Sequence, residues 1–269
     1  MQTNKIKSIN ITLSTLLISV FFVLTRTALL IFGYDFELNF FKNQNTAYIL
    51  FLLFVVFLFA IILSKKLFTT TNTQNSAGMF SKSIYILLTL VFALLFILYT
   101  KQTFDYVKTP IYEKNALKTV TSYLLPPLSI ISAIFTFQKS REKSSETLTS
   151  ILAIFAVLFF GVVLIEKFAR ISATSMSLYL FPDVAAILCM AYFMLISGKE
   201  ALGQKSETPV FHLASFFVLT FSTLPDLLMS ALAKSPLPDV KDTLFIILKI
   251  LFILLTSSNI ISFIKSQKD

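Results

Sequence analysis

Several residue types on which common folds and sites depend are nearly absent from this chain. Its only cysteine is Cys189, so no disulfide can form within the chain. Its only histidine is His212, and a zinc site would therefore have to consist of carboxylates, which zinc does not favour. The sequence also has no glycine-rich phosphate loop and no pair of histidines at metal-binding spacing. We therefore expect no metal ion, no other cofactor and no enzymatic activity.

Glycine and tryptophan are scarce as well, with five glycines and no tryptophan. Helices in lipid approach each other closely through glycine, alanine, serine and threonine. The small contacts between helices must therefore come mainly from the other three residue types, for example Ser129, Ser132 and Ala133. The shortage of glycine also disfavours an architecture that depends on flexible, broken helices.

What the chain has in quantity is apolar side chains. Of its 269 residues, 56% are hydrophobic and 14% are charged, and the mean hydropathy is +0.81. A soluble chain of this length could not bury so much apolar surface, so we expect a lipid bilayer to be part of its solvent. The net charge of +9 is spread over the ends of the apolar runs, which suits anionic headgroups and not a nucleic-acid partner.

Eight apolar windows are long enough to cross a bilayer core of roughly 30 Å, which needs about 20 helical residues. They are Ile9–Phe32, Ala47–Phe68, Ile84–Thr103, Thr119–Phe137, Thr147–Phe168, Leu178–Ser197, Val210–Leu232 and Thr243–Ile264. The first has no convincing small-residue cleavage site after it, so we interpret it as an uncleaved span. These windows predict an all-α, polytopic membrane bundle of sequential helical hairpins, forming a single transmembrane domain over residues 1–269.

The basic residues also predict an orientation. With the N-terminus inside, the cytoplasmic segments hold more lysine and arginine than the outer ones, and the clusters Lys65–Lys66 and Lys139–Lys143 directly flank spans. Such charge close to a span has the strongest effect on topology. We expect a multi-pass protein of the cell membrane with both termini in the cytoplasm.

Three prolines recur at a fixed interval. Pro126, Pro182 and Pro238 lie 56 residues apart, and Asp183 and Asp239 follow the last two. Proline has no N–H to lose in the first turn of a helix, and an aspartate there meets the positive end of the helix dipole. We interpret each position as a helix start. Either three helices use this signal independently, or a helical hairpin is repeated along the chain.

Among the ionisable residues within the spans or at their ends, four are candidates for a binding site, namely Arg26, Glu166, Asp226 and Lys249. A charge in hydrocarbon costs about 2.5–3.5 kcal/mol even on the most lenient insertion scale. At about 1.5 Å per residue, all four lie within roughly 10 Å of the outer face. Asp226 and Lys249 carry opposite charges in adjacent spans, so we predict that they pair. We further predict that all four line a ligand-binding pocket that opens outward.

These charges also have interpretations without a pocket. Lys249 leans outward and could place its ammonium among the headgroups with no partner. Pro225 could end the seventh span and leave Asp226 in water. The segment 105–118, the longest outer connection, could be an ordinary solvated loop, lie on the membrane surface, or cover the mouth of the pocket.

Two functions compete on this evidence. The first is a permease-like subunit that binds a small solute, which could be anionic, or a headgroup in the outer-leaflet pocket. The second is a non-transporting structural or assembly subunit docked on another membrane protein, which the short loops favour. A third hypothesis, a lipid-acting enzyme, would require Asp183, Asp239 and Asp242 to converge in space.

Overall fold

The computed structural model describes residues 2–35, 40–42, 44–64, 79–110, 115–141, 145–171, 177–203, 209–232 and 238–268. The described residues contain eight helices and one short β-ladder. The helices are α1 (Gln2–Gly33), α2 (Gln44–Leu63), α3 (Met79–Val107), α4 (Ala116–Ser140), α5 (Glu146–Ile171), α6 (Ser177–Ala201), α7 (Pro209–Ala231) and α8 (Val240–Lys268). Strands β1 (Tyr34–Asp35) and β2 (Phe40–Phe41) pair antiparallel between α1 and α2.

Each of the eight helices is long and apolar enough to cross a membrane. The predicted all-α bundle of eight spans is therefore confirmed, and the chain is a multi-spanning membrane protein. The helices extend beyond most predicted windows by several residues, because polar residues continue the helix past the apolar part. The exceptions are α7, which starts and ends only one residue before its window, and α2, which ends at Leu63; the end predicted for that span, Phe68, lies outside the described residues.

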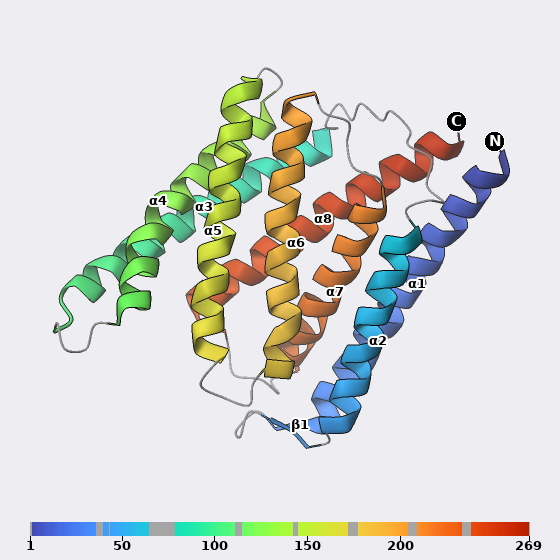
Figure 1. Cartoon of the computed structure of the whole chain (residues 1–269), viewed down its shortest axis with the longest axis horizontal. Helices are drawn as coiled ribbons and strands as arrows, with labels where there is room; N and C mark the ends of the chain where they lie inside the picture. Colours follow the sequence, from blue (N-terminus) through green and yellow to red (C-terminus); the bar gives the residue numbers. More distant parts are fainter. Residues whose placement is uncertain are drawn as a thin grey trace.

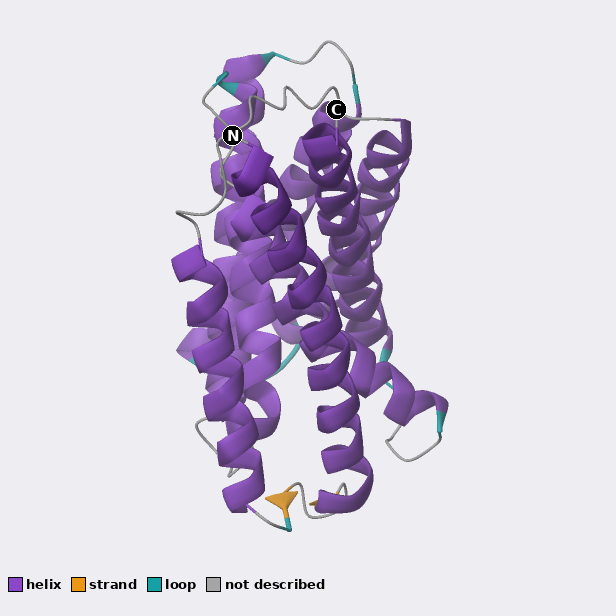
Figure 2. Ribbon diagram, turned by 90° about the vertical axis from the view of Figure 1, so that its right-hand side faces the viewer, coloured by secondary structure: helices purple, strands orange, loops and turns teal. Residues whose placement is uncertain are grey.

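Both chain termini lie at one end of the bundle, which we call the proximal end (Figure 1). The β-ladder lies at the opposite, distal end, as Figure 2 shows. Helices α5, α6 and α7 stand side by side, and the α3–α4 hairpin packs on α5 and, through α3, on α8. Helix α1 packs mainly against α7, and α2 lies at the edge of the bundle against α7 and α1.

Phenylalanine fills the two cores of the bundle. One core joins α3, α4, α5, α6 and α8, where Phe92, Phe160 and Phe252 are almost completely buried and meet edge to face. The other joins α1, α2, α7 and the C-terminal part of α8, and in it Phe54 stacks on Phe217 with 5.0 Å between ring centroids. The outward faces, including most of α2, carry exposed Leu, Ile, Val and Phe side chains, as expected for surfaces in contact with lipid.

Small hydroxyl residues form the contact face of α1, as the shortage of glycine predicts. Ser8, Thr12, Thr15 and Ser19 are all buried and recur every three to four residues. The hydroxyls of Thr12, Thr15 and Ser19 each donate to the carbonyl oxygen one turn earlier, so each of these three hydroxyls has a hydrogen-bond partner within the helix. Arg26 follows on the same face, two turns further along.

Most of the prolines are not at helix starts. Helix α4 runs through Pro126 and Pro127, α6 runs through Pro182, and α7 runs through Pro225. The helix-start interpretation is therefore wrong for Pro126, and Pro182 lies beyond the first turn of its helix. It is correct for the third position, because the Asp242 N–H donates to the Asp239 carboxylate at 2.7 Å at the start of α8. The repeated hairpin itself stays a prediction.

Candidate functional site

Arg26 of α1 satisfies three acceptors on α7. Pro225 has no N–H, so the Phe221 carbonyl four residues earlier lacks its usual helix donor. The Arg26 guanidinium donates to this carbonyl and, at 2.9 Å, to the Ser222 carbonyl. Its other nitrogen is 3.2 Å from the Asp226 carboxylate. Arg26 is only 5% exposed, and its planar fork fits this combination of acceptors better than a lysine could.

Asp183 of α6 binds two lysines. Its Oδ1 accepts from the Lys249 ammonium of α8, and its Oδ2 accepts from Lys167 of α5 at 2.5 Å. The hydroxyl of Ser222 also donates to Oδ1, at 2.9 Å, and lies 3.2 Å from the Lys249 nitrogen. Lys249 is 4% exposed. We call Arg26, Asp226, Ser222, Asp183, Lys249 and Lys167 the ion network.

The predicted pair between Asp226 and Lys249 is wrong. Asp226 pairs with Arg26, and Lys249 pairs with Asp183. The alternative in which Lys249 reaches the headgroups without a partner is also wrong. Arg26 and Lys249 bind different atoms of the same residue, the carbonyl and the hydroxyl of Ser222. The ligand-binding roles predicted for Arg26, Asp226 and Lys249 stay predictions.

Sequence reasoning missed the central role of Asp183. The proline pattern predicts a helix start at this residue, where an aspartate needs no buried partner. Asp183 in fact lies in the second turn of α6, where its side chain is 18% exposed. The sequence does contain a signal for this role. Asp183 lies inside the apolar window Leu178–Ser197, and placing an ionised carboxylate in hydrocarbon costs the same free energy there as it does at Asp226.

The proposed convergence of three aspartates does not occur. Asp183 belongs to the ion network, whereas Asp239 and Asp242 are exposed at the start of α8. In the part of the chain that the structure describes, no group of three histidine, cysteine, aspartate or glutamate side chains could hold a metal ion.

Glu166 lies next to the ion network but faces a different partner. Its two carboxylate oxygens accept from the Lys241 ammonium of α8 at 2.5 and 2.7 Å. That ammonium also lies 5.2 Å from the centre of the Tyr99 ring. Glu166 and Lys167 are consecutive on α5, so the first points to Lys241 and the second to Asp183.

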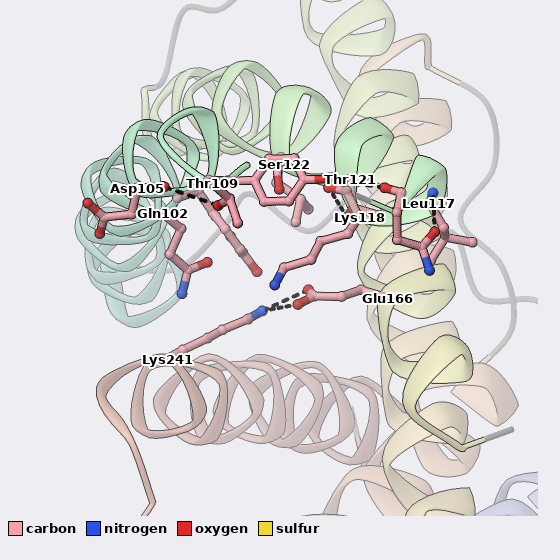
Figure 3. A pocket seen from close by; sticks show the side chains of 13 residues that line it. Gln102, Asp105, Thr109, Leu117, Lys118, Thr121, Ser122, Glu166 and Lys241 are labelled. Atoms are coloured by element: carbon pink, nitrogen blue, oxygen red, sulfur yellow. Dashed lines mark hydrogen bonds and ion pairs between the residues drawn. The ribbon is translucent and has the colours of Figure 1, made fainter. Parts of the chain in front are cut away.

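The Glu166–Lys241 pair forms part of the wall of a pocket at the distal ends of α3, α4, α5 and α8 (Figure 3). The pocket has a volume of about 620 Å³. Most of the residues that line it are of polar types; they are Tyr99, Gln102, Asp105, Tyr106, Thr109, Asn115, Leu117, Lys118, Thr121, Ser122, Leu125, Glu166 and Lys241. Of the four residues predicted to share a pocket, only Glu166 therefore lines this one.

The segment 105–118, of which residues 111–114 lie outside the described part of the chain, is not a loop throughout. Helix α3 continues to Val107 and α4 begins at Ala116, so Asp105 and Lys118 are helical. The Asn115 side chain caps α4 by accepting from the Leu117 N–H at 2.9 Å. The helical parts of this segment supply side chains to the pocket wall, so it is more than a solvated connector.

Comparison with protein-family models, with characterised proteins and with solved structures finds no match for this chain.

The distal end of α1 supplies a prediction about alkaline pH. Burial, together with the negative charges of Asp226 and Asp35, raises the pKa of the Tyr34 hydroxyl to about 12. The ordinary value is about 10, so above pH 10 the unfolded chain loses this proton before the folded chain does. We expect the free energy of unfolding to fall between about pH 10 and pH 12, and Tyr34→Phe to lack this part of the fall.

Unfolding followed by circular dichroism across this pH range measures the effect. Tyr48→Phe is the matched control, because Tyr48 is 54% exposed on α2. An identical alkaline loss in the Tyr34 and Tyr48 variants would contradict the prediction.

Proposed function

We propose that the protein is a permease-like membrane subunit that binds a small polar solute or a lipid headgroup in the distal pocket. The observation that carries this proposal is the pocket of about 620 Å³, lined largely by residues with polar groups, in a bundle that exposes many large apolar side chains elsewhere. Binding sites for small molecules generally have volumes of roughly 300–1,000 Å³ and a few convergent polar groups. The size and the lining both meet that description.

The position of the pocket supports the proposal further. Three consecutive helices, α3, α4 and α5, contribute to its wall together with α8, which is distant in sequence. Ionisable groups in a membrane protein are costly and generally mark functional positions. We propose that Glu166 and Lys241 contribute directly to the ligand site, and that the ion network holds α1, α6, α7 and α8 in place behind α5.

Thermal unfolding of the purified protein with a panel of solutes tests the proposal. The panel contains sugars, amino acids, organic acids, polyamines, glycerol and phosphate esters. We expect at least one to raise the midpoint, because a ligand that binds only the folded state stabilises it. Ser122→Phe, which places a ring in the pocket, should abolish that rise. Ser83→Phe introduces the same ring at an exposed position near the other end of α3 and should preserve it. An unchanged midpoint with every solute would contradict the proposal.

A second candidate is a non-transporting assembly subunit. One observation favours it: the charges of the ion network are matched by partners within the chain itself, as in a rigid structural unit. The two candidates differ in a measurable way. An assembly subunit should show no solute-dependent shift and should purify from mild detergent with a second membrane protein in fixed stoichiometry.

A further inference from the structure

The formal charges of the residues that line the distal pocket cancel. Two of these residues are acidic, Asp105 and Glu166, and two are basic, Lys118 and Lys241. The Lys241 ammonium donates to the Glu166 carboxylate, and the Lys118 ammonium lies 5.6 Å from the centre of the Tyr106 ring. The lining as a whole therefore has no net charge that would attract an ion of either sign.

The arrangement of these charges also disfavours a charged ligand. Both carboxylate oxygens of Glu166 accept from Lys241, and the Asp105 carboxylate points away from the other labelled side chains in Figure 3. A ligand ammonium would thus meet no available carboxylate among the described residues of the wall. An anion would meet the ammonium of Lys118, an exposed residue whose charge is weakened by water. A neutral ligand avoids both difficulties.

Neutral side chains of the wall keep hydrogen-bonding groups that the described part of the chain does not use. Gln102 of α3 keeps its whole carboxamide, and Ser122 of α4 keeps its hydroxyl. Asn115 caps α4 through its Oδ1 and keeps its amide N–H groups. In Figure 3 the Gln102 carboxamide extends from α3 toward α8. A carboxamide and a hydroxyl each donate and accept, and the hydroxyl groups of a sugar do the same.

The size and the apolar part of the wall fit a sugar as well. The volume of about 620 Å³ is larger than a single ion requires and lies within the usual range for small-molecule sites. Leu117 and Leu125 also line the pocket. A sugar ring has hydroxyl groups around its edge and C–H groups on its faces, so it can use the polar and the apolar parts of this wall together.

We propose that the distal pocket binds a neutral carbohydrate, with the Gln102 carboxamide, the Asn115 amide and the Ser122 hydroxyl as its hydrogen-bonding groups. This inference rests on the proposed ligand-binding function and names its ligand class. The Glu166–Lys241 pair stays intact and forms a fixed part of the wall. The carbohydrate can be a free sugar or the headgroup of a glycolipid, because both present the same hydroxyl groups.

The test uses the full chain in a polyoxyethylene detergent, because a maltoside detergent would itself present a sugar. The soluble arm measures the unfolding midpoint with glucose, galactose, mannose, N-acetylglucosamine and maltose. All are used at millimolar concentration, since concentrated sugars stabilise proteins without binding. The glycolipid arm compares hexyl glucoside and hexyl galactoside with hexanol, which lacks the sugar.

We expect at least one sugar probe to raise the midpoint in a saturable way. The rise should be the same at low and high salt, because the ligand carries no charge for salt to screen. A response to a free sugar identifies a soluble ligand, and a response to a hexyl glycoside alone identifies a glycolipid headgroup. A response that high salt abolishes would contradict a neutral ligand and overturn the inference.

Variants assign the effect to the pocket. Gln102→Met removes the carboxamide and keeps the length of the side chain, and it should weaken apparent binding of the responding sugar by about tenfold or more, equivalent to about 1.4 kcal/mol. Gln44→Met is the matched control, because Gln44 is exposed at the start of α2 and does not line the pocket. Binding in Gln102→Met equal to that of the unaltered protein would overturn the inference.

Failure of the inference can be told apart from failure of the proposed function. Stabilisation by an amino acid, organic acid, polyamine or phosphate ester, abolished by Ser122→Phe and with no response to any sugar probe, would overturn the carbohydrate assignment and leave the binding pocket intact. A response to sugar that persists in Ser122→Phe would come from outside the pocket and would also overturn the assignment. No stabilisation by any solute or glycoside would overturn both.

Discussion

Replacing Arg26 with methionine is expected to lower the free energy of unfolding by roughly 3–5 kcal/mol, the cost typical of removing one partner from a buried ion pair. The change leaves the Asp226 carboxylate without its cation. It also leaves the Phe221 and Ser222 carbonyls without the guanidinium, and the Phe221 carbonyl has no N–H from Pro225 to return to. A buried acceptor without a donor costs about 1–3 kcal/mol by itself.

The same geometry predicts how the loss can be repaired. Pro225→Ala supplies an N–H to the Phe221 carbonyl, and Asp226→Asn removes the stranded charge. We expect the triple variant Arg26→Met, Pro225→Ala and Asp226→Asn to be more stable than Arg26→Met alone. Because the chain has no tryptophan, unfolding in mixed micelles with increasing SDS is best followed by far-ultraviolet circular dichroism.

Arg141→Met is the matched control for this experiment. Arg141 is exposed directly after α4, and its guanidinium lies 5.6 Å from the Phe137 ring centre. An exposed substitution of this kind should change stability by about 0.5 kcal/mol or less. If Arg26→Met were as mild as Arg141→Met, Arg26 would not hold α1 to α7 in the way the structure indicates.

The spans could be predicted from the sequence, because the hydropathy of a segment determines whether it can cross a lipid bilayer as a helix. About 20 apolar residues must satisfy every backbone group within a helix, so hydropathy alone found all eight helices. Their ends were less predictable. Helix α3 continues to Val107 and α4 begins at Ala116, because polar residues can remain helical once they have left hydrocarbon. That continuation carries Asp105 and Lys118 into the wall of the pocket.

The partners of the charges could not be predicted in the same way. The cost of a charge in hydrocarbon shows that Asp226 and Lys249 need partners, and it does not say which helix supplies them. That choice depends on the rotation of each helix and on which helices are neighbours. The assumption that adjacent spans pair first was wrong, because α7 meets α1 on one side of Ser222 and α8 on the other. Asp183, on α6, is the carboxylate that pairs with Lys249.

Consecutive residues of α5 connect the Glu166–Lys241 pair in the pocket wall with the ion network. Glu166 faces the pocket and Lys167 faces Asp183. A shift of this turn of α5 would therefore change both the pocket wall and the ion network. This arrangement makes Asp183 the residue whose loss should disturb the largest number of helices, because its partners lie on α5, α7 and α8.

Asp183→Asn is accordingly expected to destabilise the protein by roughly 3–5 kcal/mol. The free-energy cost of losing the anion should differ between the two lysines that bind it. The Lys249 side chain is 6% exposed and cannot reach water, whereas that of Lys167 is 22% exposed near the distal end of α5. Most of the loss should therefore come from the stranded Lys249 ammonium.

Two double variants separate these contributions. Adding Lys249→Met to Asp183→Asn removes the stranded charge and should restore at least about 1 kcal/mol, as expected for side chains in direct contact. Adding Lys167→Met should restore much less. Asp105→Asn, at an exposed position of α3, controls for the amide substitution itself. Equal recovery with the two methionines would mean that Lys249 finds water as easily as Lys167. A double variant with Lys249→Met that is no more stable than Asp183→Asn would show that this ion pair does not hold α6 and α8 together.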